Sequence, residues 1–255
     1  MTGTETATDA RCALLARLID HAPLYPPASL PLDAALADHE RARMSDAAWM
    51  VNRFVCPASR LAEVAGLDLR LTVVVDVPWA ERPPLDDARI EAIELPLPPD
   101  LSTLREAARE VYVELPPGDV HAHIRELARH GLRAKVRCGG ETIPPVGELA
   151  AFVRACRATG VPFKATAGLH HAVRRAGQHG FVNVLAAAVF GREMEALAEA
   201  DPRAFELRPS VFRWRDGRAA SDELVRVRRE VFVSIGSCSF SEPVDELRTL
   251  GLLPL

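Results

Sequence analysis

Residues 134–168 read AKVRCGGETIPPVGELAAFVRACRATGVPFKATAG. The short apolar runs at 134–138 and 162–167 predict strands. Between them, residues 146–159 space their apolar side chains by three and four, as an amphipathic helix does. Gly160 follows directly, where a helix commonly ends in a left-handed residue. This order predicts two parallel strands joined by a helix.

The same alternation of short strands and helices extends outward from this segment. Further strands are predicted at Leu18–Leu24, Arg53–Pro57, Leu71–Val77, Ile90–Leu97, Glu110–Pro116 and Glu230–Ser237. Further helices are predicted at Leu32–Arg43, Leu101–Glu110, Val120–His130 and Phe181–Ala200. Asp100 and Asp119 stand at N-cap positions of two of these helices, and Gly131 stands at a C-cap position.

Eight predicted strands in 255 residues indicate an α/β fold of the size of a (β/α)8 barrel, which has about 250 residues. We therefore expect a single TIM-barrel domain over residues 1–255, with residues 1–10 flexible. The stretch from 171 to 229 is predicted to be a longer insertion between the seventh and eighth strands, with a hairpin at 215–218. An open, doubly wound sheet is the alternative arrangement of the same elements.

The composition excludes several classes of protein. A chain with 48% hydrophobic residues is not disordered, and no apolar run approaches the ~20 residues of a membrane-spanning helix. A net charge of −4 gives no reason to expect a nucleic-acid or membrane partner. The five cysteines form no Cys-x-x-Cys pair, and the N-terminal residues resemble no signal or transit peptide, so we expect a cytoplasmic protein. A homo-oligomer is compatible with these features.

Lysine is scarce in this chain. The 31 basic residues include two lysines, Lys135 and Lys164, and the others are arginines. Arginine stays protonated in proteins, whereas a lysine amine in a sheltered site can lose its proton and act as a nucleophile or base. Lysines that remain in a chain that otherwise uses arginine are therefore candidates for a chemical role.

Ionisable residues stand near the carboxyl ends of the predicted strands, where barrel enzymes have their active sites. Glu94, Glu114, Lys135 and Lys164 belong to four consecutive strands and are expected to lie along one arc of the barrel. Two neighbouring ammonium groups, together with burial, would lower the pKa of one amine until it titrates near neutral pH. A neutral amine attacks a carbonyl to form an imine, and the two carboxylates would then transfer the proton.

Three short segments resemble the deoxyribose-phosphate aldolases, which are class I aldolases. Leu18-Ile19-Asp20-His21 is similar to the Ile-Asp-His-Thr of that family's first strand. Arg53-Phe54-Val55-Cys56-Pro57 is similar to the Val-Cys-Val-x-Pro of its second strand. Lys164-Ala165-Thr166-Ala167-Gly168 resembles the K-T-S-T-G segment that carries the imine-forming lysine. The resemblance implies a TIM barrel and lyase chemistry through a Schiff base.

The family carries lysines on its sixth and seventh strands, as Lys135 and Lys164 are placed here. The imine-forming residue corresponds to Lys164 by motif and to Lys135 by strand order. The family's second lysine precedes a Gly-Gly phosphate turn, whereas here Gly139-Gly140 follow the strand of Lys135. The family's proton-relay aspartate on the fourth strand falls near Glu94, which is a glutamate.

These observations together predict a Schiff-base lyase of the aldolase type that acts on a small carbonyl compound, with or without a phosphate group, and uses no cofactor or metal. Lys164 is expected to be the nucleophile and Lys135 the neighbour that lowers its pKa, with the two roles open to exchange. The expected proton relays are Glu94 and Glu114. The expected substrate-binding residues are Asp20, Arg137, His170, His171, Gly236 and Ser237.

Two other functions fit parts of the sequence. Asp76, Glu94 and Glu114 end three successive strands, and three such carboxylates can hold Mg²⁺ for a lyase or isomerase that resembles the enolase superfamily. A barrel that binds a small ligand without catalysis is the third alternative. Thiols also stand at three predicted strand ends, where we expect them to be small core residues: Cys56, Cys138 and Cys238.

Overall fold

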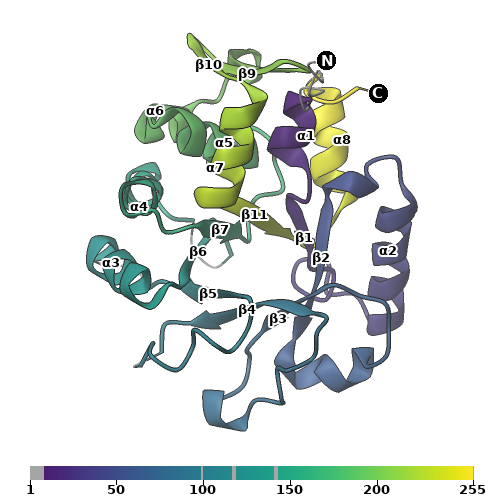
Figure 1. Ribbon diagram of the computed structural model, residues 1–255. Coiled ribbons are helices and arrows are strands. Elements are labelled where there is room, and N and C mark those ends of the chain that lie inside the picture. Colours follow the sequence, from purple (N-terminus) through teal and green to yellow (C-terminus); the bar gives the residue numbers. More distant parts are fainter. Residues whose placement is uncertain (1–8, 99, 117–118, 141–142, 255) are drawn as a thin grey trace, which may run out of the picture.

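The computed structural model describes residues 9–98, 100–116, 119–140 and 143–254. Eight parallel strands close into a barrel in the order β1-β11-β7-β6-β5-β4-β3-β2 (Figure 1). The barrel strands are β1 (Ile19–His21), β2 (Val51–Pro57), β3 (Leu71–Val74), β4 (Ile90–Pro96), β5 (Glu110–Glu114), β6 (Arg133–Arg137), β7 (Phe163–Thr166) and β11 (Phe232–Ser237). Each predicted strand is confirmed. The doubly wound alternative is wrong, because β1 pairs with both β2 and β11 and so closes the sheet.

Helices on the outside of the barrel follow most of these strands. They include α2 (Leu32–Met44), α3 (Val120–His130), α4 (Val146–Thr159), α7 (Ser221–Glu230) and α8 (Ser241–Thr249). The predicted caps are confirmed for two helices. The Asp119 carboxylate accepts a hydrogen bond from the N–H of Ala122 at 3.0 Å and so caps α3. Gly131 and Gly160 end α3 and α4 in the left-handed conformation, with φ of 65° and 68°.

Two predicted helices differ from the structure. Residues 101–109 contain turns in which the N–H groups of Leu104 and Ala107 donate to carbonyls three residues earlier. No helix extends to Glu110, because that residue begins β5 and pairs with Ala92 of β4. The predicted helix at 181–200 is divided into α5 (Phe181–Phe190) and α6 (Glu193–Ala198), since Gly191 has a φ of 68° and ends α5.

Between β7 and β11 the chain also forms a small antiparallel sheet. Its strands are β8 (Phe205–Arg208), β9 (Val211–Trp214) and β10 (Gly217–Ala219), in the order β10-β9-β8. The hairpin predicted at residues 215–218 is therefore confirmed as the connection between β9 and β10. Trp214 and Phe212 are buried, and their ring centroids lie 6.0 and 5.6 Å from that of Phe190 in α5.

Helix α1 (Ala10–Leu15) is a further element that was not predicted from the sequence. Of the residues expected to be flexible, 1–8 lie outside the described residues. Asp9 caps α1, and Ala10 is fully buried and donates its N–H to the carbonyl of Pro209 at 2.7 Å. The start of α1 is thus held against the loop between β8 and β9.

The two faces of the barrel wall differ in chemistry. On the outer face the Phe163 ring packs against Phe152 of α4 and Phe232 of β11, with centroid separations of 5.2 and 4.9 Å. Successive strand residues point to opposite faces, so Lys164 points into the barrel.

Long helices cover β6, β7 and β11, whereas β2 and β3 are followed by the short 3-10 helices η2 (Ala58–Val64) and η3 (Trp79–Glu81) (Figure 1). Two others, η1 (Ala48–Met50) and η4 (Pro202–Ala204), precede β2 and β8.

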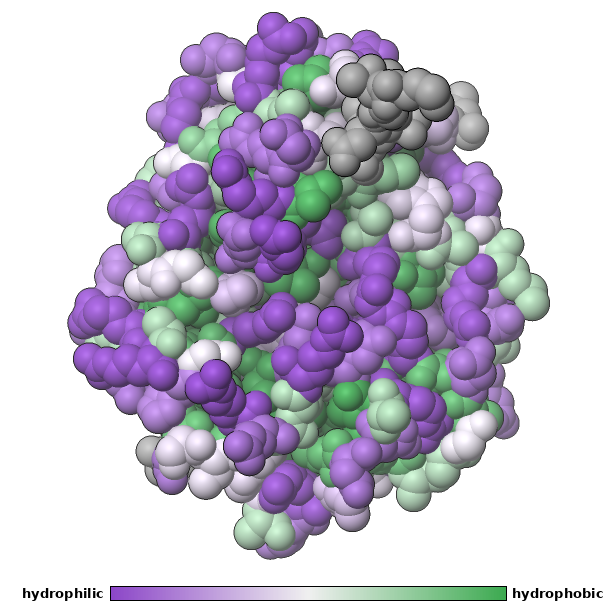
Figure 2. Space-filling model, viewed as in Figure 1, coloured by the Kyte–Doolittle hydropathy of each residue, from purple (hydrophilic) through white to green (hydrophobic). Residues whose placement is uncertain are grey.

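The face shown in Figure 2 is largely hydrophilic, and its hydrophobic residues form small groups between polar ones. The large hydrophobic side chains that are exposed come from separate segments of the chain: Met44, Leu67, Ile143, Met194 and Val225. Over the described ranges, no helix combines the length and the apolar character needed to cross a membrane.

Candidate active site

The register of the barrel strands brings the predicted charged residues together. Lys135 of β6 pairs with Glu114 of β5 on one side and with Lys164 of β7 on the other. Glu94 lies on β4, the next strand beyond β5. The predicted arc of two glutamates and two lysines on four consecutive strands is therefore confirmed.

Acidic and basic side chains alternate through this part of the barrel. Lys135 Nζ lies 2.9 Å from Glu114 Oε2 and 2.7 Å from Glu94 Oε2. The other oxygen of Glu94, Oε1, lies 2.6 Å from Lys164 Nζ. Lys164 Nζ also contacts Asp20 Oδ2 of β1. Glu94 thus bridges the two lysines, and five charged groups form one continuous chain.

The five charged groups differ in their access to solvent. The side chains of Lys164 and Asp20 are 0% exposed, whereas that of Glu114 is 29% exposed. A cavity of about 650 Å³ opens at the carboxyl ends of the strands, and Glu94, Glu114 and Lys135 line it. Lys164 and Asp20 are not among its lining residues. Lys135 is therefore the amine that a molecule in the cavity would meet, and Lys164 lies beneath it.

The predicted lowering of the Lys164 pKa is wrong. Burial by itself would lower the pKa of this ammonium, but the adjacent carboxylates of Asp20 and Glu94 outweigh burial and raise the pKa above its ordinary value. In the same way, burial would raise the pKa of Glu94, but Lys135 and Lys164 outweigh it and lower that pKa to about 2. Lys164 therefore stays protonated and Glu94 ionised at neutral pH.

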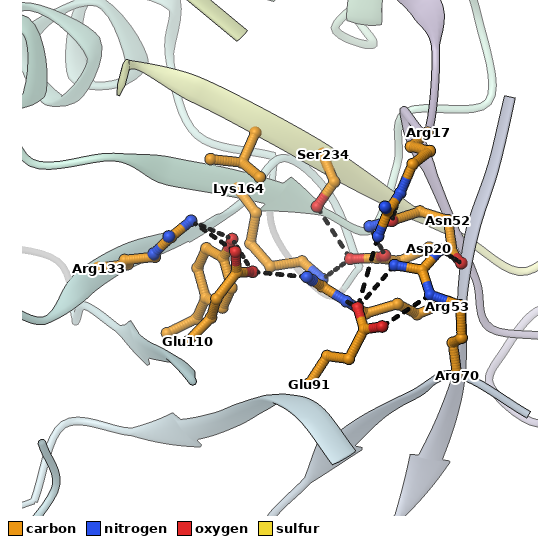
Figure 3. A network of polar contacts seen from close by, with 12 residues as sticks. Arg17, Asp20, Asn52, Arg53, Arg70, Glu91, Glu110, Arg133, Lys164 and Ser234 are labelled. Atoms are coloured by element: carbon orange, nitrogen blue, oxygen red, sulfur yellow. Dashed lines mark hydrogen bonds and ion pairs between the residues drawn. The ribbon is translucent and has the colours of Figure 1, made fainter. Parts of the chain in front are cut away.

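Hydrogen bonds from other strands hold Asp20 in place (Figure 3). Asn52 of β2 donates from Nδ2 to Asp20 Oδ1 at 2.6 Å, and the Ser234 hydroxyl of β11 donates to Oδ2 at 2.9 Å. Asp20, predicted to bind substrate, is thus a buried partner of Lys164. Asn52 and Ser234 are not among the site residues predicted from the sequence, although Ser234 lies in a predicted strand and Asn52 directly precedes one.

A second ionic network lies nearer the amino ends of the strands (Figure 3). Arg53 Nε lies 3.0 Å from Glu91 Oε2, and Arg53 Nη2 lies 2.8 Å from Glu110 Oε2. Arg70 and Arg17 also reach Glu91, and Arg133 reaches Glu110. The hydroxyl of Tyr112 donates to Glu110 at 3.0 Å, and the ring of Tyr112 lies 5.4 Å from Lys164 Nζ. These residues, which the sequence analysis did not single out, form the floor beneath Lys164 and Asp20.

The other predicted substrate-binding residues divide between the cavity and its rim. Arg137, His170, Gly236 and Ser237 line the cavity. His171 is not in the lining, and its Nδ1 lies 3.0 Å from Glu246 Oε1 of α8.

Gly236 has a packing role in this wall. A Cβ at that position would lie 2.9 Å from Cγ2 of Thr166 on the neighbouring strand. The Ser237 hydroxyl is engaged within its own turn, since it donates to the carbonyl of Ser239 at 2.6 Å.

The carboxylates proposed for a metal site have other partners. Asp76 accepts hydrogen bonds from the Ser59 N–H, at 2.9 Å, and from the Ser59 hydroxyl, and Lys135 Nζ lies between Glu94 and Glu114. Among the residues that the structure describes, no three His, Cys, Asp or Glu side chains are grouped closely enough to hold a metal ion.

The three thiols at strand ends are buried and free. Burial raises the pKa of Cys56 to about 11 and that of Cys138 to about 12. It also raises the pKa of Cys238. The groups are therefore protonated at neutral pH, which agrees with the expected role as small core residues.

The fold and the arrangement of its charged strand ends define the chain as a TIM-like (β/α)8 barrel. Comparison with known proteins adds no family to this description, because no protein-family model matches the sequence and no curated protein matches it significantly.

Proposed function

We propose that the protein is an imine-forming lyase of the aldolase type that acts on a small carbonyl compound. The observation that carries this proposal is the position of Lys135 Nζ, which borders the cavity and lies between the carboxylates of Glu94 and Glu114. An amine that reacts with a carbonyl needs a group that first takes its proton and later protonates the departing oxygen. The proposal assigns the nucleophile to Lys135.

Glu114 is the best placed of the carboxylates to transfer protons. Glu94 contacts both lysines and has a pKa of about 2, so it is a poor base at neutral pH. Glu114 pairs with Lys135 alone among the described residues, and its side chain is partly open to the cavity. We therefore assign the proton relay to Glu114 and the fixed anion to Glu94.

The proposed reaction starts with the transfer of a proton from the Lys135 ammonium to the Glu114 carboxylate. The neutral amine forms a bond to the carbonyl carbon, and the electron pair of the C=O bond moves to oxygen, which takes the proton back from Glu114. A second proton passes from nitrogen to Glu114 and on to the hydroxyl group, which leaves as water. The resulting iminium accepts the electron pair of the Cα–Cβ bond when that bond breaks: an enamine remains on Lys135, and the other fragment leaves as an aldehyde or ketone after its hydroxyl proton passes to Glu114.

Lys164 has a supporting role in this scheme. Its ammonium neutralises part of the charge on Glu94 and Asp20 in the barrel interior. Without it, Glu94 would depend on Lys135 and Asp20 on the hydrogen bonds from Asn52 and Ser234. With Lys164 in place, Glu94 is shared between two cations, and its hold on the Lys135 ammonium is weaker than that of an unshared carboxylate.

Borohydride trapping tests the proposal. The protein is incubated with a set of small aldehydes and ketones, reduced with borohydride and digested, and the modified peptide is identified by mass spectrometry. A reduced adduct on Lys135 is expected, and the Lys135→Arg variant should form none because a guanidinium does not give an imine. An adduct on Lys164 would overturn the assignment of the nucleophile, and the absence of any adduct across the set would overturn the proposed chemistry. Binding of a carbonyl compound without an adduct would instead favour the non-catalytic alternative.

A further inference from the structure

Arg137 stands beside the proposed nucleophile. It is the last residue of β6, two positions after Lys135, and it pairs with Thr166 of β7. Residues two apart on a strand point to the same face, with their Cα atoms about 7 Å apart. Both side chains accordingly line the cavity, and Arg137 is the one arginine among the described residues of its lining.

The two cations of the cavity wall differ in their charge balance. Lys135 is matched by Glu94 and Glu114. Arg137 has no ion pair or side-chain hydrogen bond with any residue in the described part of the chain, and its side chain is exposed. An anion in the cavity would therefore be repelled by the carboxylates of its lining, Asp76, Glu94 and Glu114, and attracted to the guanidinium.

The loop that follows β6 is shaped to accept this guanidinium. Gly140 has a φ of 106°, and a Cβ placed there would lie 3.0 Å from Arg137 Nη2. Because Gly140 has no side chain, the guanidinium lies close against its backbone. This contact limits where the planar guanidinium can lie at the edge of the cavity.

The opposite part of the lining has a different character. Its apolar residues come from β2, β3, β4 and the segment after β1: Ala22, Pro26, Pro27, Val55, Val74 and Leu95. Tyr25 and Asp76, from the segments after β1 and β3, are polar residues of this part. The apolar residues fit a carbon skeleton. Among the residues that the structure describes, the cavity thus combines one amine, one guanidinium without an ion pair and a largely apolar wall.

We propose that the substrate is an anionic carbonyl compound, whose carboxylate or phosphate group binds Arg137 while its carbonyl carbon meets Lys135 Nζ. This inference rests on the proposed function, to which it adds the class of substrate. Arginine forms paired, parallel hydrogen bonds with either anion, so the two anions share one recognition chemistry. Anchoring the anion at Arg137 would hold the carbonyl within reach of an amine on the same strand.

Paired probes test this inference. Pyruvate is compared with acetone, and glyceraldehyde 3-phosphate with glyceraldehyde, in borohydride trapping on the wild-type protein and on Arg137→Gln. We expect at least one charged probe to be trapped at roughly tenfold lower concentration than its neutral counterpart, and Arg137→Gln to abolish that preference, so that the charged and neutral probes of a pair are trapped at similar concentrations. A preference in the pyruvate pair alone identifies a carboxylate, and one in the other pair alone a phosphate. Equal trapping of charged and neutral probes by the wild-type protein would overturn the inference.

Two further measurements separate this inference from the proposed function. Arg175→Gln is the matched control, because Arg175 is exposed on the nearby loop after β7 but does not line the cavity; it should keep the wild-type preference. If no probe is trapped, the proposed function fails, and the anion site is judged by thermal stabilisation with pyruvate and with inorganic phosphate. Stabilisation that Arg137→Gln removes would support the site, and no stabilisation of the wild-type protein would overturn it.

Discussion

Lys135 and Lys164 are direct partners in the register of β6 and β7, and each binds a different oxygen of one carboxylate, that of Glu94. The two ammonium groups are therefore neighbours that do not need to repel each other strongly, because an anion lies between them. Their surroundings differ. Lys164 is fully enclosed with Asp20 on its other side, whereas Lys135 borders the cavity and Glu114. The same residue type thus serves as a structural ion in one strand and as a candidate nucleophile in the next.

The first prediction is that the two lysines contribute unequally to the free energy of unfolding. Lys164→Met leaves Asp20 and Glu94 with one cation fewer in a fully buried site, and such losses cost about 3–5 kcal/mol of the free energy of unfolding. Lys135→Met should cost less, because Lys164 still pairs with Glu94 and water reaches Glu114. Urea unfolding at pH 7 measures both. An equal or larger loss for Lys135→Met would contradict the assignment of Lys164 as the structural ion.

The second prediction separates two glutamates on one strand. Glu114 and Glu110 are four residues apart on β5, so both point into the barrel, one at the cavity and the other at its floor. Glu114→Gln should lower kcat by about 10²–10⁴-fold, as loss of a proton relay does, with little change in Tm.

Glu110→Gln is the matched variant and should behave in the opposite way. Glu110 accepts hydrogen bonds from Arg53 at 2.8 Å and from the Tyr112 hydroxyl at 3.0 Å, so removal of its charge leaves the buried Arg53 with Glu91 as its carboxylate partner and weakens the bond from Tyr112. We expect a clear fall in Tm and near-normal kcat in the protein that remains folded. Steady-state kinetics and calorimetry on both variants check the pair, and a kcat that falls as far in Glu110→Gln as in Glu114→Gln would remove the distinction.

Much of the fold is predictable from local sequence. Each barrel strand is a short apolar run interrupted by inward polar residues and bounded by loop or helix residues, and Gly131 and Gly160 mark two helix ends that the structure confirms. The prediction of a helix at 101–110 failed because helical spacing in so short a segment does not reveal that its last residue belongs to β5. Glu110 belongs to β5 because it pairs with Ala92 of β4. Such a pairing joins residues that are distant in the sequence, so local spacing does not reveal it.

The residues that make up the candidate site could be predicted from the sequence, but how deeply each of them lies in the barrel could not. The scarcity of lysine drew attention to Lys135 and Lys164, and strand order placed them with Glu94 and Glu114. Which amine borders the cavity depends on how neighbouring strands are staggered along the barrel, and no spacing in the sequence gives that stagger. The ligands of Asp20 show the same limit, since Asn52 and Ser234 are 32 and 214 residues away along the chain.

The third prediction concerns the loop after β7, which carries several cavity residues. Glu246 of α8 holds this loop through His171 Nδ1, at 3.0 Å, and through the N–H of Ala172. Glu246→Ala should free the loop and raise KM severalfold, with a smaller effect on kcat, because His170 and Gln178 of the same loop line the cavity while the reacting groups lie on strands. Asp245→Ala, one residue earlier on α8 and exposed, is the control and should leave KM unchanged. Equal kinetics for the two variants would show that the contact does not position the loop.

The last prediction concerns two buried histidines that join β1 to α2. His21 Nδ1 lies 3.2 Å from His39 Nδ1, and His21 Nε2 lies 3.2 Å from Asp38 Oδ2. Burial lowers the pKa of His21 to about 4, despite the opposing effect of Asp38. Burial, with the charges of His21 and Arg43, lowers the pKa of His39 to about 3, although Asp38 again opposes the shift.

Both histidines are therefore neutral in the folded protein at pH 6, while in the unfolded chain they begin to bind protons below about pH 6.5. The unfolded state then holds more protons, so the stability that the neutral pair contributes is complete above pH 6.5 and is lost as the pH falls toward 4, by an amount on the order of 3 kcal/mol for each histidine. His39→Leu should flatten this dependence, because one of the two groups no longer titrates. The exposed His121→Gln should retain the slope. Urea unfolding between pH 4.5 and 7.5 measures it, and a slope in His39→Leu as steep as in the wild-type protein would show that the acid sensitivity arises elsewhere.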